Sequence, residues 1–139
     1  MNLLYLGDIN SVHDFKWVTY FSVQKKYTVF FVTESENYNL INPERKAVFQ
    51  QANITVLPPI FNFSLFNIFQ TYKSIILLRQ FIRNYNIDIF HTLFGSPQAI
   101  WLNFLPKKSK KVITTRGSDV LVQLKSVCES GGIKNKILK

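Results

Sequence analysis

The polar residues best suited to chemistry in this sequence stand at the ends of short apolar runs. Gly7 and Asp8 follow the run Asn2–Leu6, and His91 ends the run IDIFH. A third group follows the run KVITT, and its members are Arg116, Gly117, Ser118 and Asp119. Carboxylates accept hydrogen bonds from hydroxyl groups, and arginine binds anions through its planar fork of donors. These residue types therefore predict a site for an anion or for sugar hydroxyls.

Each candidate also has a purely structural interpretation. The pair Gly7-Asp8 could form only a tight turn, and His91 could be a hydrogen-bonded core histidine. His13 falls in the first turn of a predicted helix, where its ring could reach either a cleft or solvent. Gly95 and Ser96 precede another predicted helix, which the serine could simply cap, although free amides at such an end also bind phosphate. Residue types alone leave these alternatives open.

Several well-known motifs are missing from the sequence. No G-x-G-x-x-G follows the first apolar run and no G-x-x-x-x-G-K-[ST] occurs, which argues against a nicotinamide or flavin site and against a P-loop. The two histidines and the single cysteine, Cys128, lack the spacing of metal ligands. We therefore expect no metal and no resident cofactor, and we expect Cys128 to be an idle or buried thiol.

Apolar runs and periodic apolar positions predict the elements that place these residues. Runs rich in β-branched and aromatic residues predict strands at 2–6, 27–33, 53–57, 87–91 and 111–115. Helices are predicted near 12–25, 65–84 and 97–104, and residues 133–139 resemble the first turns of another.

Capping residues support these helices. Ser11 with Asp14 fits a capping box for the first helix, and Ser64 can cap the second. Residues 34–52 are polar and ambiguous, although Pro43 can open a short helix there.

Strands that alternate with helices form a parallel sheet with helices on both faces. The simplest arrangement is an α/β, doubly wound, Rossmann-like sheet in a single domain. Ligands of such sheets bind at the carboxyl ends of the strands. Because Gly7-Asp8, His91 and Arg116 all fall at predicted strand ends, we expect them to gather around one pocket.

The composition favours one folded domain. The chain has 139 residues, of which 47% are hydrophobic and 18% are charged, and domains usually run to about 100–200 residues. No apolar run approaches the roughly 18 residues of a membrane span, and the first residues lack the basic start of a signal peptide. A single cysteine cannot form an internal disulfide, so a cytoplasmic location is the default expectation.

The net charge of +9 is concentrated toward the end of the chain. Residues 107–139 hold nine basic and two acidic residues, a balance of +7, and the cluster Lys107-Lys108-Ser109-Lys110-Lys111 is the densest point. Such a field attracts anionic lipid, phosphorylated substrates or nucleic acid, unless the lysines only solvate a loop. Nothing resembles an RNA-recognition strand, a zinc finger or a basic zipper, so nucleic acid is not the expected partner.

Three blocks of the sequence resemble a known family. Leu4–Trp17 (LYLGDINSVHDFKW), Asp88–Ala99 (DIFHTLFGSPQA) and Val112–Leu121 (VITTRGSDVL) are similar to the amino-terminal domain of group 1 glycosyltransferases. These are the retaining, two-domain, family 4 enzymes of the GT-B fold. The similarity runs across the whole chain in order.

The resemblance implies two Rossmann-like domains that face each other across a cleft. This domain would mainly hold the acceptor, and the second domain would mainly hold the donor, a nucleotide diphosphate sugar. Gly7-Asp8 would match the loop after the first strand, near the donor phosphates and the acceptor. His91 would match the histidine that ends the fourth strand. The segment Arg116–Asp119 would match the segment after the fifth strand, where many members carry a histidine before the glycine.

Three departures from the family pattern bear on the implied function. Arg116 stands where many members have a histidine, so a histidine role cannot be transferred to it. The loop after the first strand has one glycine where many members have several. The donor domain and its glutamate-rich motif are missing, so residues 1–139 would be a truncated acceptor-side domain that is inactive alone. The intact enzyme would transfer a sugar to a lipid-linked or glycan acceptor in cell-envelope polysaccharide synthesis, at the inner face of the membrane, with His91 and Arg116 orienting acceptor or sugar.

A non-enzymatic alternative is a flavodoxin-like module that binds a protein partner or an anionic membrane surface. A truncated sheet would also expose a strand edge and apolar helix faces, which favours self-association.

Overall fold

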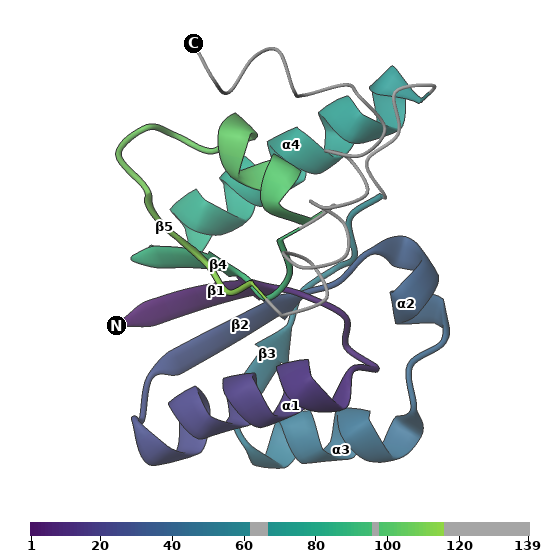
Figure 1. Cartoon of the computed structure of the whole chain (residues 1–139), viewed down its shortest axis with the longest axis vertical. Helices are drawn as coiled ribbons and strands as arrows, with labels where there is room; N and C mark the ends of the chain where they lie inside the picture. Colours follow the sequence, from purple (N-terminus) through teal and green to yellow (C-terminus); the bar gives the residue numbers. More distant parts are fainter. Residues whose placement is uncertain (62–66, 96–97, 116–139) are drawn as a thin grey trace, which may run out of the picture.

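The computed structural model describes residues 1–61, 67–95 and 98–115, whose strands form one parallel sheet (Figure 1). The strands are β1 (Asn2–Leu6), β2 (Thr28–Val32), β3 (Ile54–Val56), β4 (Ile89–Thr92) and β5 (Lys110–Ile113). Their spatial order is β3-β2-β1-β4-β5, so the first strand of the chain lies in the middle of the sheet. The order reverses at β1, which is the topological switch point of a doubly wound fold.

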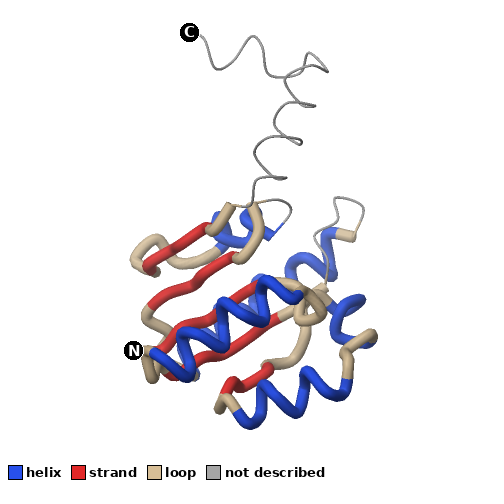
Figure 2. Tube along the Cα trace, turned by 60° about the horizontal axis from the view of Figure 1, so that its bottom comes forward, coloured by secondary structure: helices blue, strands red, loops and turns tan. Residues whose placement is uncertain are grey.

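Helices cover both faces of the sheet (Figures 1 and 2). One face carries α1 (Val12–Thr19), the π-helix η1 (Tyr20–Gln24) and α3 (Pro43–Gln51). The other face carries α4 (Ile68–Asn84) and the 3₁₀-helix η2 (Gln98–Phe104), and the short α2 (Ser35–Asn39) follows β2. The predicted α/β, doubly wound, Rossmann-like sheet is therefore confirmed.

Alternating strand residues divide the core into two layers. Leu4 packs in the same apolar cluster as Trp101 of η2, whereas its neighbour Tyr5 packs in the cluster that contains Phe49 of α3. All four of these side chains are fully buried. Successive residues of a strand point to opposite faces, so each strand contributes to both layers and fixes the helices on either side.

The helices differ from the sequence prediction mainly in their boundaries. The ambiguous stretch 34–52 holds α2 and α3, and α3 begins at Pro43 as predicted, with the Asn42 side chain accepting the Glu44 N–H at 2.8 Å. The first helix is α-helical only to Thr19 and continues as η1 to Gln24.

The two later helices also differ from the prediction. Helix α4 begins at Ile68, because Asn67 accepts the Gln70 N–H at 3.2 Å and so caps it. The predicted cap, Ser64, and the predicted helix at 133–139 lie outside the described residues. The segment predicted as a helix over 97–104 is 3₁₀ rather than α over its described part, Gln98–Phe104.

Three helices are followed by a non-glycine residue in the left-handed backbone conformation, which glycine usually adopts after a helix. Lys26, Asn53 and Asn86 have φ angles of 54°, 55° and 48°. Each stands just after the last capping residue of η1, α3 or α4, where a left-handed residue satisfies the final carbonyls.

Candidate functional site

The carboxyl ends of the strands meet at one edge of the sheet and bring several polar residues there. Leu6 of β1 pairs with Val32 of β2 on one side and with Thr92 of β4 on the other. Asp8 and Glu34 therefore each stand two residues beyond a paired position on neighbouring strands. This is the edge at which a doubly wound sheet binds its ligands.

The loop after β1 is organised by the buried carboxylate of Asp14, in the first turn of α1. Asp14 Oδ2 accepts the Asp8 N–H at 2.8 Å, and Oδ1 accepts the Ser11 hydroxyl at 3.2 Å. Ser11 caps the helix by accepting the Asp14 N–H, as predicted. The Ser11 N–H, which a standard capping box would direct to the acidic side chain, donates instead to the Asp8 carbonyl.

Gly7 allows the Asp14 carboxylate to approach the main chain. A β-carbon at position 7 would stand 2.5 Å from Asp14 Oδ2 and 3.3 Å from Leu93 Cδ1. The first distance is far inside a normal non-bonded contact, so a larger residue would displace the carboxylate. The single glycine of this loop is therefore explained by close packing.

The same loop is also hydrogen-bonded to the connection between α2 and α3. Asn10 Nδ2 donates to the Asn37 carbonyl at 3.1 Å, and Asn10 Oδ1 accepts the Asn42 N–H at 3.3 Å. Arg45 Nη1 donates to the Ile9 carbonyl at 3.5 Å. The loop that presents Asp8 is thus fixed from two directions before any ligand arrives, which is the preorganisation that binding sites need.

Glu34 is a candidate site residue that the sequence prediction missed. It follows the carboxyl end of β2, it is only 8% exposed, and its Oε1 has no hydrogen-bond partner in the described part of the chain. Burial, together with the nearby carboxylates of Glu36 and Asp8, raises the pKa of Glu34. The available signal was its position directly after the strand predicted at 27–33, which parallels the position of Asp8.

His91 is a buried histidine in the second-last position of β4. Its ring lies 4.9 Å from the Tyr5 ring, and its Nε2 shares a 2.7 Å hydrogen bond with Thr114 Oγ1. Burial lowers the pKa of His91 to about 4, so the ring is neutral at neutral pH. The bond to Thr114 connects β4 to the chain that continues beyond β5.

The remaining predicted site residues are described only in part. His13 is exposed in the first turn of α1, and Gly95 is partly buried in the bend after β4. Ser96 lies outside the described residues, and so do Arg116, Gly117, Ser118 and Asp119. The structure therefore places Gly7, Asp8 and His91 at the ends of the two central strands.

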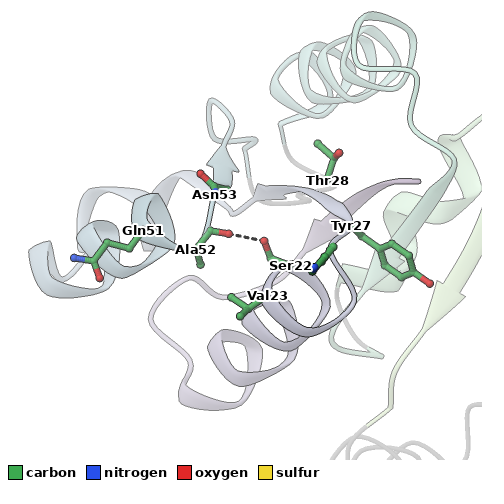
Figure 3. Close-up of a pocket in the computed structure, with 8 residues that line it drawn as sticks. Ser22, Val23, Tyr27, Thr28, Gln51, Ala52 and Asn53 are labelled. Atoms are coloured by element: carbon green, nitrogen blue, oxygen red, sulfur yellow. Dashed lines mark hydrogen bonds between the residues drawn. The ribbon is translucent and has the colours of Figure 1, made fainter.

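A hollow of about 480 Å³ lies at the opposite, amino-terminal edge of the sheet (Figure 3). Thr28, which begins β2, and Asn53, which precedes β3, line it. Ser22 Oγ donates to the Ala52 carbonyl across it, whereas the polar end of Tyr27 points away. We assign this hollow no function.

The described residues contain no group of three or more His, Cys, Asp or Glu side chains able to bind a metal ion. None of the helices described is both long and apolar enough to span a bilayer.

The comparison with known protein families agrees with this architecture. The family described as "Glycosyl transferase 4-like" matches residues 2–139. The chain belongs to this glycosyl transferase 4-like family. Membership confirms the resemblance carried by the three sequence blocks, and it assigns the domain to glycosyltransferases. Neither a curated protein nor a solved structure gives a match.

Proposed function

We propose that this glycosyl transferase 4-like domain binds the acceptor of a retaining glycosyltransferase. The enzyme moves a sugar from a nucleotide diphosphate sugar to a lipid-linked or glycan acceptor in cell-envelope polysaccharide synthesis, at the cytoplasmic face of the membrane. The observation that carries the acceptor role is the pair of carboxylates, Asp8 and Glu34, at the carboxyl ends of the adjacent strands β1 and β2.

The two carboxylates suit a ligand rich in hydroxyl groups. Glu34 Oε1 is buried without a donor among the described residues, and a buried acceptor of this kind is normally satisfied. A hydroxyl of the acceptor sugar supplies the missing donor through a charge-assisted hydrogen bond. Asp8 is presented in one orientation because Asn10 and Asp14 hydrogen-bond it on both sides.

His91 acts in this proposal as a positioning residue. It is neutral at neutral pH, and its bond to Thr114 fixes the start of the segment that leads to Arg116. In the proposal, Arg116, Gly117, Ser118 and Asp119 contact the transferred sugar or the acceptor. A second, donor-binding domain of the intact enzyme would stabilise the charge that develops on the leaving phosphate.

The experiment is a transfer assay on the complete gene product with labelled nucleotide diphosphate sugars and a panel of lipid-linked acceptors. Glu34→Gln keeps the side-chain size and removes the charge, so the KM for the acceptor should rise about tenfold while the KM for the donor is unchanged. Glu44→Gln, at an exposed position of α3, is the matched control and should change neither constant.

An unchanged acceptor KM in Glu34→Gln, or a rise of the donor KM alone, would show that these carboxylates do not bind the acceptor. Absence of transfer with every donor and acceptor would contradict the proposed reaction itself.

A further inference from the structure

The outer face of α4 leaves large apolar side chains in solvent. Ile68, Phe69 and Tyr72 are 76%, 67% and 60% exposed, and Ile76, one turn further, is 39% exposed. Their spacing places them on one side of the helix. Buried residues on the other side, such as Leu78, already pack against the sheet. Packing within the described residues therefore does not explain why this face of α4 carries large apolar side chains.

Basic side chains continue the same face. The Lys73 ammonium lies over the Phe69 ring, 4.5 Å from its centroid. Arg79 and Arg83 follow Tyr72 at seven and eleven residues, so all three lie along one side of the helix. The face is therefore apolar in its first half and basic in its second.

The direction of α4 puts the apolar half toward the candidate site. The helix ends beside the start of β1, where Asn2 Nδ2 donates to the Tyr85 carbonyl at 2.8 Å. It begins after the carboxyl end of β3, where the Phe61 N–H donates to Ser74 Oγ at 2.9 Å (Figure 1). Ile68, Phe69 and Tyr72 thus lie on the side of the sheet edge where the strands end.

A similar apolar patch lies on α1 and η1, where Lys16, Lys25 and Lys26 are also exposed, so the two faces differ in the net charge of the half of the chain around them rather than in their own basic residues. That patch also has a lysine over an aromatic ring, with Lys25 lying 5.7 Å from the centroid of Tyr20. However, residues 1–60 hold five basic and five acidic residues and so have no net charge. Residues 61–115 hold seven basic residues and a single acidic one, Asp88, a balance of +6.

We propose that the outer face of α4 docks on an anionic lipid bilayer. Ile68, Phe69 and Tyr72 enter the headgroup layer, while Lys73 and the two arginines pair with lipid phosphates. Helices that lie in a membrane interface combine an apolar face with lysine and arginine in this way. A second copy of the chain fits less well, because it would bring an equal positive charge against the first.

The test is co-sedimentation of the purified chain with vesicles of phosphatidylcholine alone or mixed with phosphatidylglycerol. It needs no sugar substrate, so its outcome is independent of the proposed transfer reaction. We expect binding only to the anionic vesicles. Phe69→Ser with Tyr72→Ser should weaken it about tenfold or more, since two aromatic side chains leave the interface.

The matched control is Tyr20→Ser with Val23→Ser, in the half of the chain that has no net charge, which should bind like the parent chain. All four side chains are exposed, and circular dichroism should report the parent fold for both double variants.

Three outcomes would overturn the proposal. The first is equal binding to neutral vesicles or no binding at all. The second is equal loss of binding in the two double variants. The third is light scattering that shows a dimer dissociated by the Phe69 and Tyr72 substitutions without vesicle binding, which would make the face an interface between copies.

Discussion

Residues 1–60 and residues 61–115 form the two halves of one sheet and differ in charge and in surface. The first half has no net charge, and Asn10 and Arg45 connect its loops by hydrogen bonds. The second half has an excess of six positive charges, and its longest helix leaves Phe69 and Tyr72 in solvent. The difference indicates a division of labour, with one half holding a ligand-facing loop in place and the other keeping a surface for an external partner.

The largest expected effect contrasts a buried aromatic residue of the first half with an exposed one of the second. Phe49 is fully buried and lies 5.6 Å from the Phe15 ring and 5.5 Å from the Phe31 ring. Phe49→Ala should therefore lower the free energy of unfolding by about 3–5 kcal/mol, whereas Phe69→Ala should change it by less than about 0.5 kcal/mol. Urea denaturation followed by circular dichroism measures both.

A large destabilisation by Phe69→Ala would contradict the comparison, because it would show that the outer face of α4 is needed for folding. The exposed apolar side chains of α4 would then be explained by a role in folding and not by an external partner.

The next effect concerns His91, which belongs to the second half but packs on Tyr5 of the first. Burial lowers its pKa to about 4, below its unfolded value of about 6.5. Its contribution to stability is therefore fully present above pH 6.5 and is lost as the pH falls toward 4. The loss should reach about 2–3 kcal/mol.

The measurement compares unfolding free energies of the parent chain and His91→Gln between pH 7 and pH 4. The variant should show a shallower decline, and His13→Gln, at the exposed histidine, should follow the parent. Parallel curves for the parent and His91→Gln would mean that His91 keeps an ordinary pKa in the fold.

The smallest of the three effects tests the fixed loop of the first half. Gly7→Ala places a β-carbon against the Asp14 carboxylate and should cost about 2 kcal/mol. In a double-mutant cycle, the same change should cost less in an Asp14→Ser background, because the oxygen that it meets is removed. Equal costs in both backgrounds would rule out the contact as the cause.

Much of the fold could be predicted because the strands are short runs of apolar and β-branched residues. The predicted ranges 2–6 and 53–57 overlap β1 and β3, and the capping residue Ser11 was recognised from its spacing to Asp14. Helix α3 was harder to predict because it buries only Phe49, so its sequence has little apolar periodicity. The 3₁₀ form of η2 also leaves no clear pattern in a segment of seven residues.

The site was predictable only in part. Strand ends could be read from the sequence, which placed Gly7 and Asp8 directly after β1, whereas His91, predicted to end its strand, is followed by Thr92 in β4. The importance of Glu34 depends on burial of one oxygen and on the nearby charge of Asp8, and neither is local in sequence. The partner of His91, Thr114, is 23 residues away and likewise depends on strand register.

The central place of β1 has a consequence for how the chain is made. Leu4 pairs with Phe30 of β2 and with Phe90 of β4, so β1 receives its second neighbour from a residue 86 positions further along the chain. Until then β1, β2 and β3 can assemble only as a half-sheet with one bare backbone edge and one uncovered apolar face. Nascent intermediates of this kind aggregate readily, so the speed at which α4 and β4 are translated should limit how much protein is recovered folded.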